Sequence, residues 1–523
     1  MPDRWQRELI DAVPRLLSLQ DRDPTSVSFG CFDRRWWGWK FSDFPAPRAQ
    51  EGLASLAALW ALQDPRNPCY QKPSVLAWIA AGLRFAARIQ HADGSFDEAY
   101  PNERSWGATA FIAAACADVL ERVGAALEPS DRGVAVDIIR NAARFLVAHD
   151  ETHGFLSNHR AAAAAALAAA CDTCGDPTFG VAADRLVDGV RARGSNEGWL
   201  LEYAGADPGY QSHALGYLAA VQRRRGGLGE LLGNCCTFLG WFVAPDGSLG
   251  GEYGSRNTSF WFPGGAESLA ATLPQAARLA RRLRDGRATG LAAMDTQNFL
   301  PLLGSIATAA LCKAPAGEAM LPTDAPARRW FPEAGLLVHA TSRYVAVASA
   351  HKGVVIANGR DGSTFSSAGW VAGDATSQGY VKVPPVDLQE DSLVTERAFF
   401  ARKSDRFEPG RFVAFRLATL GPARFAPVGA RLKAALVKRL VSGVAERPLT
   451  LRRCLHFAEN ELTIQDRVSW RGAAEPVHVE RFTAIHMGSS GYFQAAELAP
   501  RACVVVEERR TPGCVERTQR VRF

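Results

Sequence analysis

Apolar residues recur at helical spacing from about residue 47 to residue 313. Stretches rich in alanine and leucine alternate there with loops of Gly, Asp and Pro, and the loops contain little strand signal. Apolar positions three and four residues apart predict helices, and Gly and Pro predict the breaks between them. We therefore expect about ten helices of roughly 12 to 20 residues, among them EGLASLAALWALQ, SVLAWIAAGLRFAARIQ, ATAFIAAACADVLERV and RAAAAAALAAA.

The high alanine content of these stretches predicts close contact between helices, as in stacked helical hairpins or a toroid. The densest stretch is GFLSNHRAAAAAALAAACDTCGD, residues 154–176, in which Asn158 and His159 directly precede the alanines. Asparagine is a favoured residue at the start of a helix. The pair is thus either a helix cap or a pair of reactive side chains on a rigid support.

The pattern changes near residue 325. The stretch RRWFPEAGLLVHATSRYVAVASAHKGVVIANGRDGSTFSS alternates apolar and polar positions and is rich in Val, Tyr and Thr, as are RFVAFRLATL, LTLRRCLHFAENELTIQDRVSW, EPVHVERFTAIHM and ACVVVEERRTPGCVERTQRVRF. Short strands at regular spacing favour an antiparallel β-sandwich. We expect two domains, a helical domain over residues 1–320 and a sandwich over residues 321–523.

One stretch within the sandwich region, ARLKAALVKRLVSGV at residues 430–444, predicts an amphipathic, basic helix. Such a helix is either solvated between two strands or faces a membrane or a partner.

Composition and charge narrow the functional class. With 523 residues the chain is too long for one ordinary core, and 47% hydrophobic and 22% charged residues are typical of globular proteins. The net charge of +6 permits an acidic ligand, but no basic run is interleaved with aromatic residues, so we expect no nucleic-acid partner. No segment reaches the roughly 18 apolar residues of a membrane span.

The N-terminal residues MPDRWQRELIDAVPRLLSLQDRD carry charges every few positions, unlike a signal peptide. Eleven irregularly spaced cysteines are typical of reduced thiols rather than of a disulfide framework. These features predict a cytoplasmic protein, or a periplasmic one if a leader is missing from the sequence. They give no indication of the oligomeric state.

Three loops of the helical region resemble one another: residues 92–105, 196–212 and 245–259. Each passes from a glycine turn through an apolar residue to an acidic residue and then a tyrosine. If helix pairs repeat, these loops lie on the same side of the fold. That side would gather the residues Glu98, Glu202, Glu252, Tyr100, Tyr203, Tyr210, Tyr253, Arg104 and Arg256. The alternative is that these residues only form turns, because DGS is a common turn sequence.

The residue types in these segments suit acid–base chemistry. Asn158 supplies a neutral amide, and His159 can be cationic or basic near neutral pH. Tyr210 can donate or accept a proton if a nearby cation such as Arg104 or Arg256 lowers its pKa. Arg256 could equally brace its loop. The tryptophans of DRRWWGWKFSDFP, residues 33–45, suit either stacking on sugars or packing of the N-terminal segment.

These motifs together resemble the heparinase II/III and oligoalginate lyase superfamily. The resemblance rests on Asn158-His159 before the alanine-rich helix, on LLEYAGADPGYQS at residues 200–212, and on FPEAGLLVHA at residues 331–340, which is similar to the strand that opens the family's sandwich. It implies an incomplete (α/α) toroid followed by an antiparallel β-sandwich.

The resemblance also implies cleavage of a uronic-acid-containing polysaccharide or oligosaccharide by β-elimination. Asn158 would neutralise the uronate carboxylate, and His159 would assist it or act as a base. Tyr210 would remove the C5 proton or protonate the leaving oxygen. We expect the acidic glycan to be bound by Arg104, Tyr100, Glu202, Tyr253 and Arg256.

The chain departs from the family pattern in several places, one of which is that the GWLLEY loop lacks the usual DG start. Tyr210 is followed by Gln211 instead of histidine, and the family's zinc-site motif HxHxD is replaced by SAHKGVVIANGRD. We therefore predict no cofactor, while a structural zinc held by His351, Asp361 and His456 stays possible.

Two other functional classes remain open on the sequence alone. A glycoside hydrolase on a similar toroid would use two carboxylates, such as Glu98 and Glu252. A non-catalytic glycan-binding protein of surface-polysaccharide assembly would need neither. A terpenoid cyclase is also suggested by QHADGSF, but the DxDD acid motif is missing.

Overall fold

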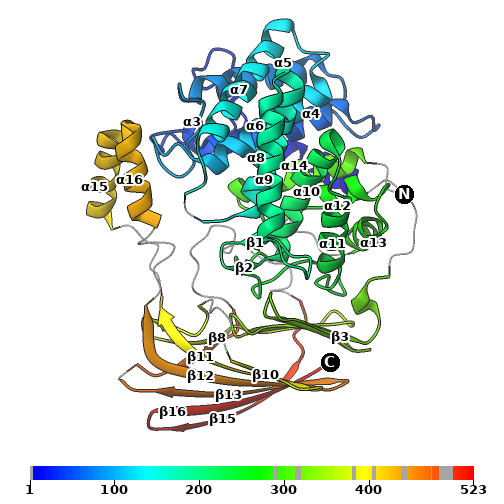
Figure 1. Ribbon diagram of the computed structural model, residues 1–523, viewed down its shortest axis with the longest axis vertical. Helices are drawn as coiled ribbons and strands as arrows, with labels where there is room; N and C mark the ends of the chain where they lie inside the picture. The colour runs from blue at the N-terminus through cyan, green and yellow to red at the C-terminus, as the bar shows by residue number, and fades with distance from the viewer. Residues whose placement is uncertain are drawn as a thin grey trace.

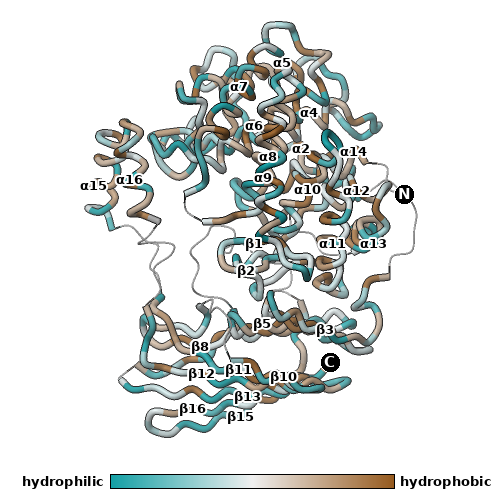
Figure 2. The backbone as a smooth tube through the Cα atoms, in the orientation of Figure 1, coloured by the Kyte–Doolittle hydropathy of each residue, from teal (hydrophilic) through white to brown (hydrophobic). Residues whose placement is uncertain are grey.

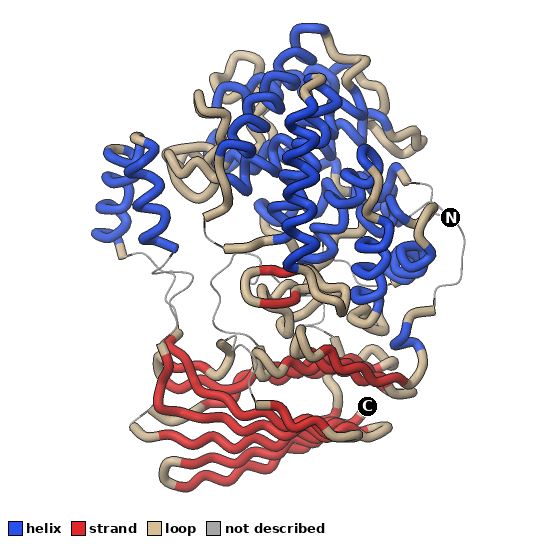
Figure 3. The backbone as a smooth tube through the Cα atoms, in the orientation of Figure 1, coloured by secondary structure: helices blue, strands red, loops and turns tan. Residues whose placement is uncertain are grey.

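The computed structural model describes residues 4–152, 154–286, 291–312, 320–379, 385–402, 408–437, 445–472, 474–481 and 499–523. Helices form the N-terminal part, and two layers of strands form most of the C-terminal part below it (Figures 1 and 3). The predicted fold class, a helical toroid followed by an antiparallel sandwich, is confirmed. The predicted domain boundary at residue 320 falls between the last helix of the toroid and the first strand of the sandwich.

An inner ring of helices forms the toroid. Each inner helix packs against the next, and the last packs against the first. The inner helices are α4 (Gly52–Ala61), α6 (Trp106–Val123), α8 (Ser157–Cys174), α10 (Pro208–Arg225), α12 (Gly264–Leu269) and α14 (Thr296–Leu311). Helix α12 has only 6 residues, about 9 Å of helix. The inner ring is therefore shorter along its axis at α12 than at the other inner helices.

The outer helices each cover the inner helix next to them in sequence. They are α5 (Pro73–Ile89), α7 (Pro129–Ala148), α9 (Pro177–Arg193), α11 (Gly229–Gly240) and α13 (Pro274–Asp285), while α1 (Arg4–Asp11) covers α14. Shorter elements complete this part: α2 (Val13–Leu19), α3 (Arg34–Trp37), η1 (Pro47–Glu51), η2 (Leu291–Ala293), η3 (Pro322–Asp324), β1 (Leu201–Glu202) and β2 (Gly205–Ala206).

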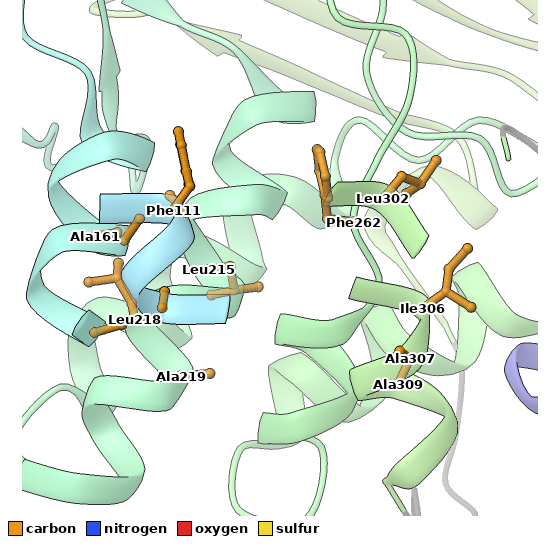
Figure 4. Close-up of a cluster of buried hydrophobic side chains, with 14 of the residues drawn as sticks. Phe111, Ala161, Leu215, Leu218, Ala219, Phe262, Leu302, Ile306, Ala307 and Ala309 are labelled. Carbon is orange, nitrogen blue, oxygen red and sulfur yellow. The ribbon is translucent and has the colours of Figure 1, made fainter. Parts of the chain in front are cut away.

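The alanine-rich helix α8 is an inner helix, in contact with α6, α7, α9 and α10. Its residues Ala161 to Ala170 are all buried. Methyl side chains let four neighbouring helices approach closely, so larger residues here would overpack the ring. Figure 4 shows Ala161 in this packing beside Phe111 of α6 and Leu218 of α10. The helix ends at Gly175, whose φ of 68° is the left-handed conformation that favours glycine.

The sandwich consists of a five-stranded and a nine-stranded antiparallel sheet. The first has the order β3-β4-β5-β6-β7, and the second has the order β14-β8-β9-β11-β12-β13-β16-β15 with β10 paired to β11. The first sheet comprises β3 (Ala327–Phe331), β4 (Leu336–Ala340), β5 (Tyr344–Ser349), β6 (Val354–Gly359) and β7 (Thr364–Ser367). The second comprises β8 (Gly369–Ala372), β9 (Ala375–Thr376), β10 (Val386–Leu388), β11 (Ser392–Ala401), β12 (Glu446–Phe457), β13 (Glu461–Trp470), β14 (Val477–Val479), β15 (Cys503–Thr511) and β16 (Cys514–Arg522). Residues 482–487, predicted as strand, lie outside the described residues.

The five-stranded sheet lies between the toroid and the larger sheet. Val345 and Val347 belong to the same hydrophobic cluster as the toroid core, whereas Tyr344 and Ala346 pack with Ile464 of the larger sheet. Both faces are therefore buried, which explains why β5 is buried at every position. The larger sheet has one exposed face, and β13 alternates buried and exposed residues accordingly.

The basic stretch predicted as one helix is part of a helical hairpin between β11 and β12. The hairpin consists of α15 (Pro409–Leu420) and α16 (Ala426–Val437), joined by η4 (Pro422–Arg424), and residues 438–444 of the prediction lie outside the described residues. The prediction of a strand for RFVAFRLATL, residues 411–420, is wrong, because this stretch forms most of α15. The hairpin lies beside the toroid although its neighbours in sequence belong to the sandwich (Figure 1). In the part of the chain that the structure describes, no helix combines the length and apolarity needed to cross a membrane.

Candidate active site

Three inner helices begin at the same end of the ring with a regular spacing. Helices α6, α8 and α10 start at Trp106, Ser157 and Pro208, each 51 residues after the one before. Ala108, His159 and Tyr210 are thus the third residues of successive inner helices. A helix N-terminus carries partial positive charge, so this end of the ring favours a negatively charged ligand.

A cavity of about 250 Å³ lies at this end of the ring. The three predicted catalytic residues Asn158, His159 and Tyr210 all line it, together with Arg48, Glu98, Phe111, Tyr203, His213, Arg256, Phe260, Phe262, Gln297, Asn298 and Pro301. The structure therefore brings the proposed amide, imidazole and phenol to one place.

Asn158 is held by a buried carboxylate. Its backbone N–H and its side-chain Nδ2 each donate to Glu202 at 2.8 Å. The N-cap of α8 is Leu156, which makes no side-chain cap hydrogen bond, so Asn158 is not the helix cap. Burial raises the pKa of Glu202, and Arg256 and Asn158 oppose that rise. These two bonds fix the orientation of the amide. The Oδ1 atom of Asn158 lies on the side away from Glu202 and has no hydrogen-bond partner among the described residues.

His159 is held from two sides. Its Nδ1 lies 2.8 Å from Oε2 of the buried Glu151, and its ring meets the edge of Phe111 at a centroid distance of 5.2 Å. Helix α6 presents Gly107 to the ring, and a Cβ atom at this position would lie 2.5 Å from Nδ1. Glycine is thus required for the imidazole to occupy its place.

Tyr210 stacks against Arg256. The Arg256 Cζ atom lies 3.5 Å from the centroid of the Tyr210 ring, and its Nη1 lies 3.3 Å from Glu202 Oε2. Burial alone would lower the pKa of Arg256, but interactions with Tyr210 and Glu202 outweigh it and raise that pKa. Asp207, the N-cap of α10, accepts hydrogen bonds from the backbone N–H groups of Tyr210 at 3.0 Å and Arg256 at 2.8 Å. One carboxylate thereby fixes the backbone positions from which the phenol and the guanidinium extend.

A second cation, Arg48, also lines the cavity. Arg48 pairs with Glu51 at 2.6 Å and with Glu98 at 3.3 Å, and its guanidinium lies 4.3 Å from the centroid of Phe111. Burial raises the pKa of Glu51, whereas the pKa of Glu98 is lowered because Arg48 and His159 outweigh its burial. Arg48 and Glu51 precede α4 in a segment without a motif, so sequence analysis did not identify them.

His213 is a further cavity residue that sequence analysis missed. It lies one turn after Tyr210 and stacks on Phe262 at a centroid distance of 4.0 Å. Burial, together with the cations around it, lowers its pKa well below the ordinary value, so the ring is neutral. With Phe111 it also lines a second cavity of about 380 Å³ between the inner helices. The helical spacing of three residues from Tyr210 is the signal that could have revealed it.

Gln211, which departs from the family motif, has a bracing position. It is fully buried, its Oε1 accepts from the backbone of Leu200 at 3.1 Å, and its Nε2 donates to the backbone of Gly198 at 3.0 Å. Gln211 therefore fixes the loop before Glu202. The histidine that lines the cavity is His213, two residues further along the same helix.

The remaining predicted binding residues lie in different places. Glu202 lies beneath the cavity and Arg256 lines it, but Tyr100 packs edge-on against Phe415 of the hairpin, at a centroid distance of 5.1 Å. Arg104 donates to the backbone oxygen of Arg424 at 2.9 Å. Tyr253 stacks on Phe242 within the toroid core, at 5.7 Å. The three similar loops therefore converge only in part. Each contributes at least one residue to the site, whereas Tyr100, Arg104 and Tyr253 pack elsewhere.

The residues considered for a zinc site do not come together. Asp361 Oδ1 accepts from Ser363, and His456 Nε2 lies 3.2 Å from Cys454 Sγ. His351 lies in the turn after β5, where it faces Gly335. Among the residues that the structure describes, no three side chains of His, Cys, Asp or Glu are grouped to hold a metal ion.

Lys352, beside His351, joins the sandwich to the site. Its fully buried Nζ donates to the backbone oxygens of Glu252 and Gly254 at 2.8 Å and also contacts Asn257 Oδ1. Burial lowers the pKa of this lysine to about 7. Through the side chain of Lys352, the sandwich thus holds the loop that carries Arg256.

The fold is that of the heparinase-like polysaccharide lyases. Chondroitin AC lyase of Streptomyces coelicolor A3, solved in complex with chondroitin sulphate, is similar with a TM-score of 0.57 and 11% identity over 99% of this chain and 77% of that chain. Heparinase III is similar with a TM-score of 0.52 and 9% identity over 100% of this chain and 83% of that chain. No protein-family model matches the sequence, and a search of the curated proteins finds no similar sequence. At such low identity the structural similarity shows the fold alone, and the site must carry the function.

Proposed function

We propose that the protein is a lyase that cleaves a uronic-acid-containing glycan by β-elimination. The observation that carries the proposal is the single cavity in which Asn158, His159, Tyr210 and Arg256 meet. An amide, an imidazole, a phenol and a guanidinium are the groups that this reaction needs around one sugar ring.

The first requirement is to stabilise charge on the substrate. The C5 proton of a uronate is weakly acidic, and its removal moves negative charge onto the carboxyl group. Asn158, through the second hydrogen of its Nδ2, and His159 bind that group, oriented by Glu202 and Glu151 respectively. The N-termini of α8 and α10 and the nearby Arg48 add positive potential.

The second requirement is proton transfer. Tyr210 as phenolate takes the C5 proton, the C5–H electrons form the C4–C5 double bond, and the C4–O bond breaks. The leaving oxygen then receives a proton, from the same phenol in our proposal, so that the tyrosine returns to its initial state. Arg256, whose Cζ atom lies 3.5 Å from the centroid of the Tyr210 ring, holds that ring in position.

A glycoside hydrolase using Glu98 and Glu252 is disfavoured. Glu98 lines the cavity, but Glu252 is buried elsewhere, with its Oε1 3.4 Å from Arg481 Nη2. Two carboxylates acting on one glycosidic bond must flank it at close separation. The placement of Glu252 does not meet this requirement.

The experiment incubates the protein with a panel of uronate polymers and oligosaccharides and follows both unsaturated-uronate absorbance and new reducing ends. Absorbance that rises with reducing ends supports β-elimination. Reducing ends without absorbance would establish a hydrolase, and binding without cleavage would favour a glycan-binding protein. The variants Tyr210→Phe and Asn158→Ala should lose about 100-fold or more in rate, while Tyr253→Phe, outside the cavity, should retain activity.

A further inference from the structure

The hairpin α15–α16 carries an apolar surface that faces solvent. Six of its large apolar side chains are between 40% and 69% exposed: Phe412, Val413, Leu417, Leu420, Phe425 and Val428. We call these six residues the hairpin face. Figure 2 shows that the hairpin projects beside the toroid and contains several apolar segments. Single exposed apolar residues are common, but six within one short hairpin indicate a docking surface.

A second exposed segment, far away in sequence, lies next to the hairpin. Arg416 pairs with Asp43 at 3.2 Å and stacks over Phe44, 5.5 Å from its ring centroid. Just before Asp43, the side chains of Trp39 and Phe41 are 68% and 87% exposed. The other two tryptophans of this segment pack inward, Trp36 on Phe85 and Trp37 through a hydrogen bond to the backbone of Leu19. Trp39 and Phe41 thus extend the apolar surface beyond the hairpin face.

The hairpin is strongly basic. Residues 408–437 contain five basic residues and one acidic residue. Two of the five are used in packing, Arg416 on Asp43 and Lys433 on Glu103 at 3.4 Å, whereas Arg424 and Arg431 are exposed, as is Lys40 beside Trp39. The apolar side chains therefore project from a surface of positive charge.

We propose that this surface docks on an anionic phospholipid bilayer. Short helices with exposed Phe, Leu and Val among Arg and Lys insert into the headgroup boundary, and anionic lipids attract the cations. The surface projects from the molecule rather than forming a groove for a peptide, and its positive charge is complementary to acidic headgroups. Helices of 12 residues each are too short to span a bilayer and would lie along its surface.

The contact between hairpin and toroid relates this surface to the cavity. Asn102 Nδ2 donates to the backbone of Thr419 at 3.0 Å, and Arg104 donates to the backbone of Arg424. Both residues belong to the loop that carries Glu98, which lines the cavity. A docked hairpin therefore places the candidate site next to the lipid surface. The docking itself does not depend on the proposed reaction.

The test uses the full chain and vesicles of phosphatidylcholine, alone or mixed with an equal part of phosphatidylglycerol. We expect cosedimentation with the mixed vesicles at low salt, with affinity at least about tenfold higher than for phosphatidylcholine alone and reduced by salt. The triple variant Phe412→Ser/Leu417→Ser/Phe425→Ser should abolish the binding. The control Val147→Ser/Val181→Ser changes residues that are 51% and 59% exposed on other helices and should bind like the unchanged protein.

Three outcomes would overturn the proposal. The unchanged protein could fail to bind anionic vesicles, or the control variant could lose binding as fully as the triple variant. The triple variant could also convert an oligomer to a monomer in light scattering without changing vesicle binding, which would make the surface an interface between copies of the chain. Circular dichroism of each variant separates loss of docking from loss of folding.

Discussion

The substitution Gly107→Ala provides a direct test of the role of His159, because it acts on the imidazole without changing any group that could bind substrate. A Cβ atom at residue 107 would lie 2.5 Å from His159 Nδ1 and 2.7 Å from Cε1. Ordinary contact begins near 3.4 Å, so the ring must move by about 1 Å. A displacement of that size at a catalytic group costs on the order of 100-fold in rate.

The expected change in stability is small by comparison. Overpacking costs about 1–3 kcal/mol, and replacing glycine by alanine inside a helix returns about 0.5–1 kcal/mol. We therefore expect Gly107→Ala to stay folded at room temperature, with an unfolding free energy lower by up to about 2.5 kcal/mol. The loss in rate should exceed what this change in stability can explain.

The assay is the rate of unsaturated-uronate formation, together with urea unfolding of the same samples. Gly133→Ala is the matched control, because a Cβ atom on Gly133 in α7 would meet no atom within 4 Å; it should retain activity and gain slightly in stability. Full activity and an unchanged pH profile in Gly107→Ala would refute the view that the position of His159 matters for the reaction.

The remaining predictions concern the buried charges and histidines. Glu202→Gln should destabilise the protein by about 3–5 kcal/mol, because it removes the carboxylate that pairs with the buried Arg256 and cannot accept both hydrogen bonds from Asn158; urea unfolding checks this, and a loss below about 1 kcal/mol would contradict the buried ion pair. Burial lowers the pKa of both His339 and His478 to about 4. Since the unfolded chain takes up these protons near pH 6.5 and the folded chain does not, stability should fall as the pH drops from about 6.5 towards 4. The loss is about 2 kcal/mol per histidine between about pH 7 and about pH 5. His339→Gln should weaken this dependence in unfolding experiments, and an unchanged pH dependence in that variant would show that other groups cause it. Because Lys352 holds the Arg256 loop, Lys352→Met should lower the rate of unsaturated-uronate formation by a larger factor than the loss of unfolding free energy explains. A variant with full activity would contradict that role.

The architecture could be predicted from local pattern because burial leaves a direct mark on the sequence. The central part of the inner helix α8, residues 161–170, is buried throughout and consists of nine alanines and one leucine. The strand β5, covered on both faces, is an almost continuous apolar run. Alternation in β13 likewise indicates one exposed face. Each of these signals depends only on neighbouring residues, so it needs no knowledge of the tertiary fold.

The candidate site was predictable only where a motif marked it. Asn158, His159 and Tyr210 stand at the starts of helices in recognisable segments, and all three line the cavity. Arg48 lies in the short helix η1 and Glu151 in a loop, and neither is marked by a motif. The position of Arg48 at the cavity and of Glu151 beside His159 depends on the closure of the ring. Tyr100 and Arg104 matched the loop pattern equally well, but in the structure they contact the hairpin, some 320 residues further along the chain.

The sequence alone determined the two-domain class, most of the helical and strand regions, and the amide, imidazole and phenol that form the centre of the candidate site. It did not reveal that residues 411–420, which have a strand-like composition, form the helix α15. The tertiary structure alone decided which charged residues join the amide, imidazole and phenol. It placed Glu202 beneath Asn158, Glu151 beside His159 and Lys352 of the sandwich under the Arg256 loop. The physical reason is that local structure follows from periodicity and side-chain propensity, whereas a buried charge is stable only beside a partner that the fold supplies from a distant segment.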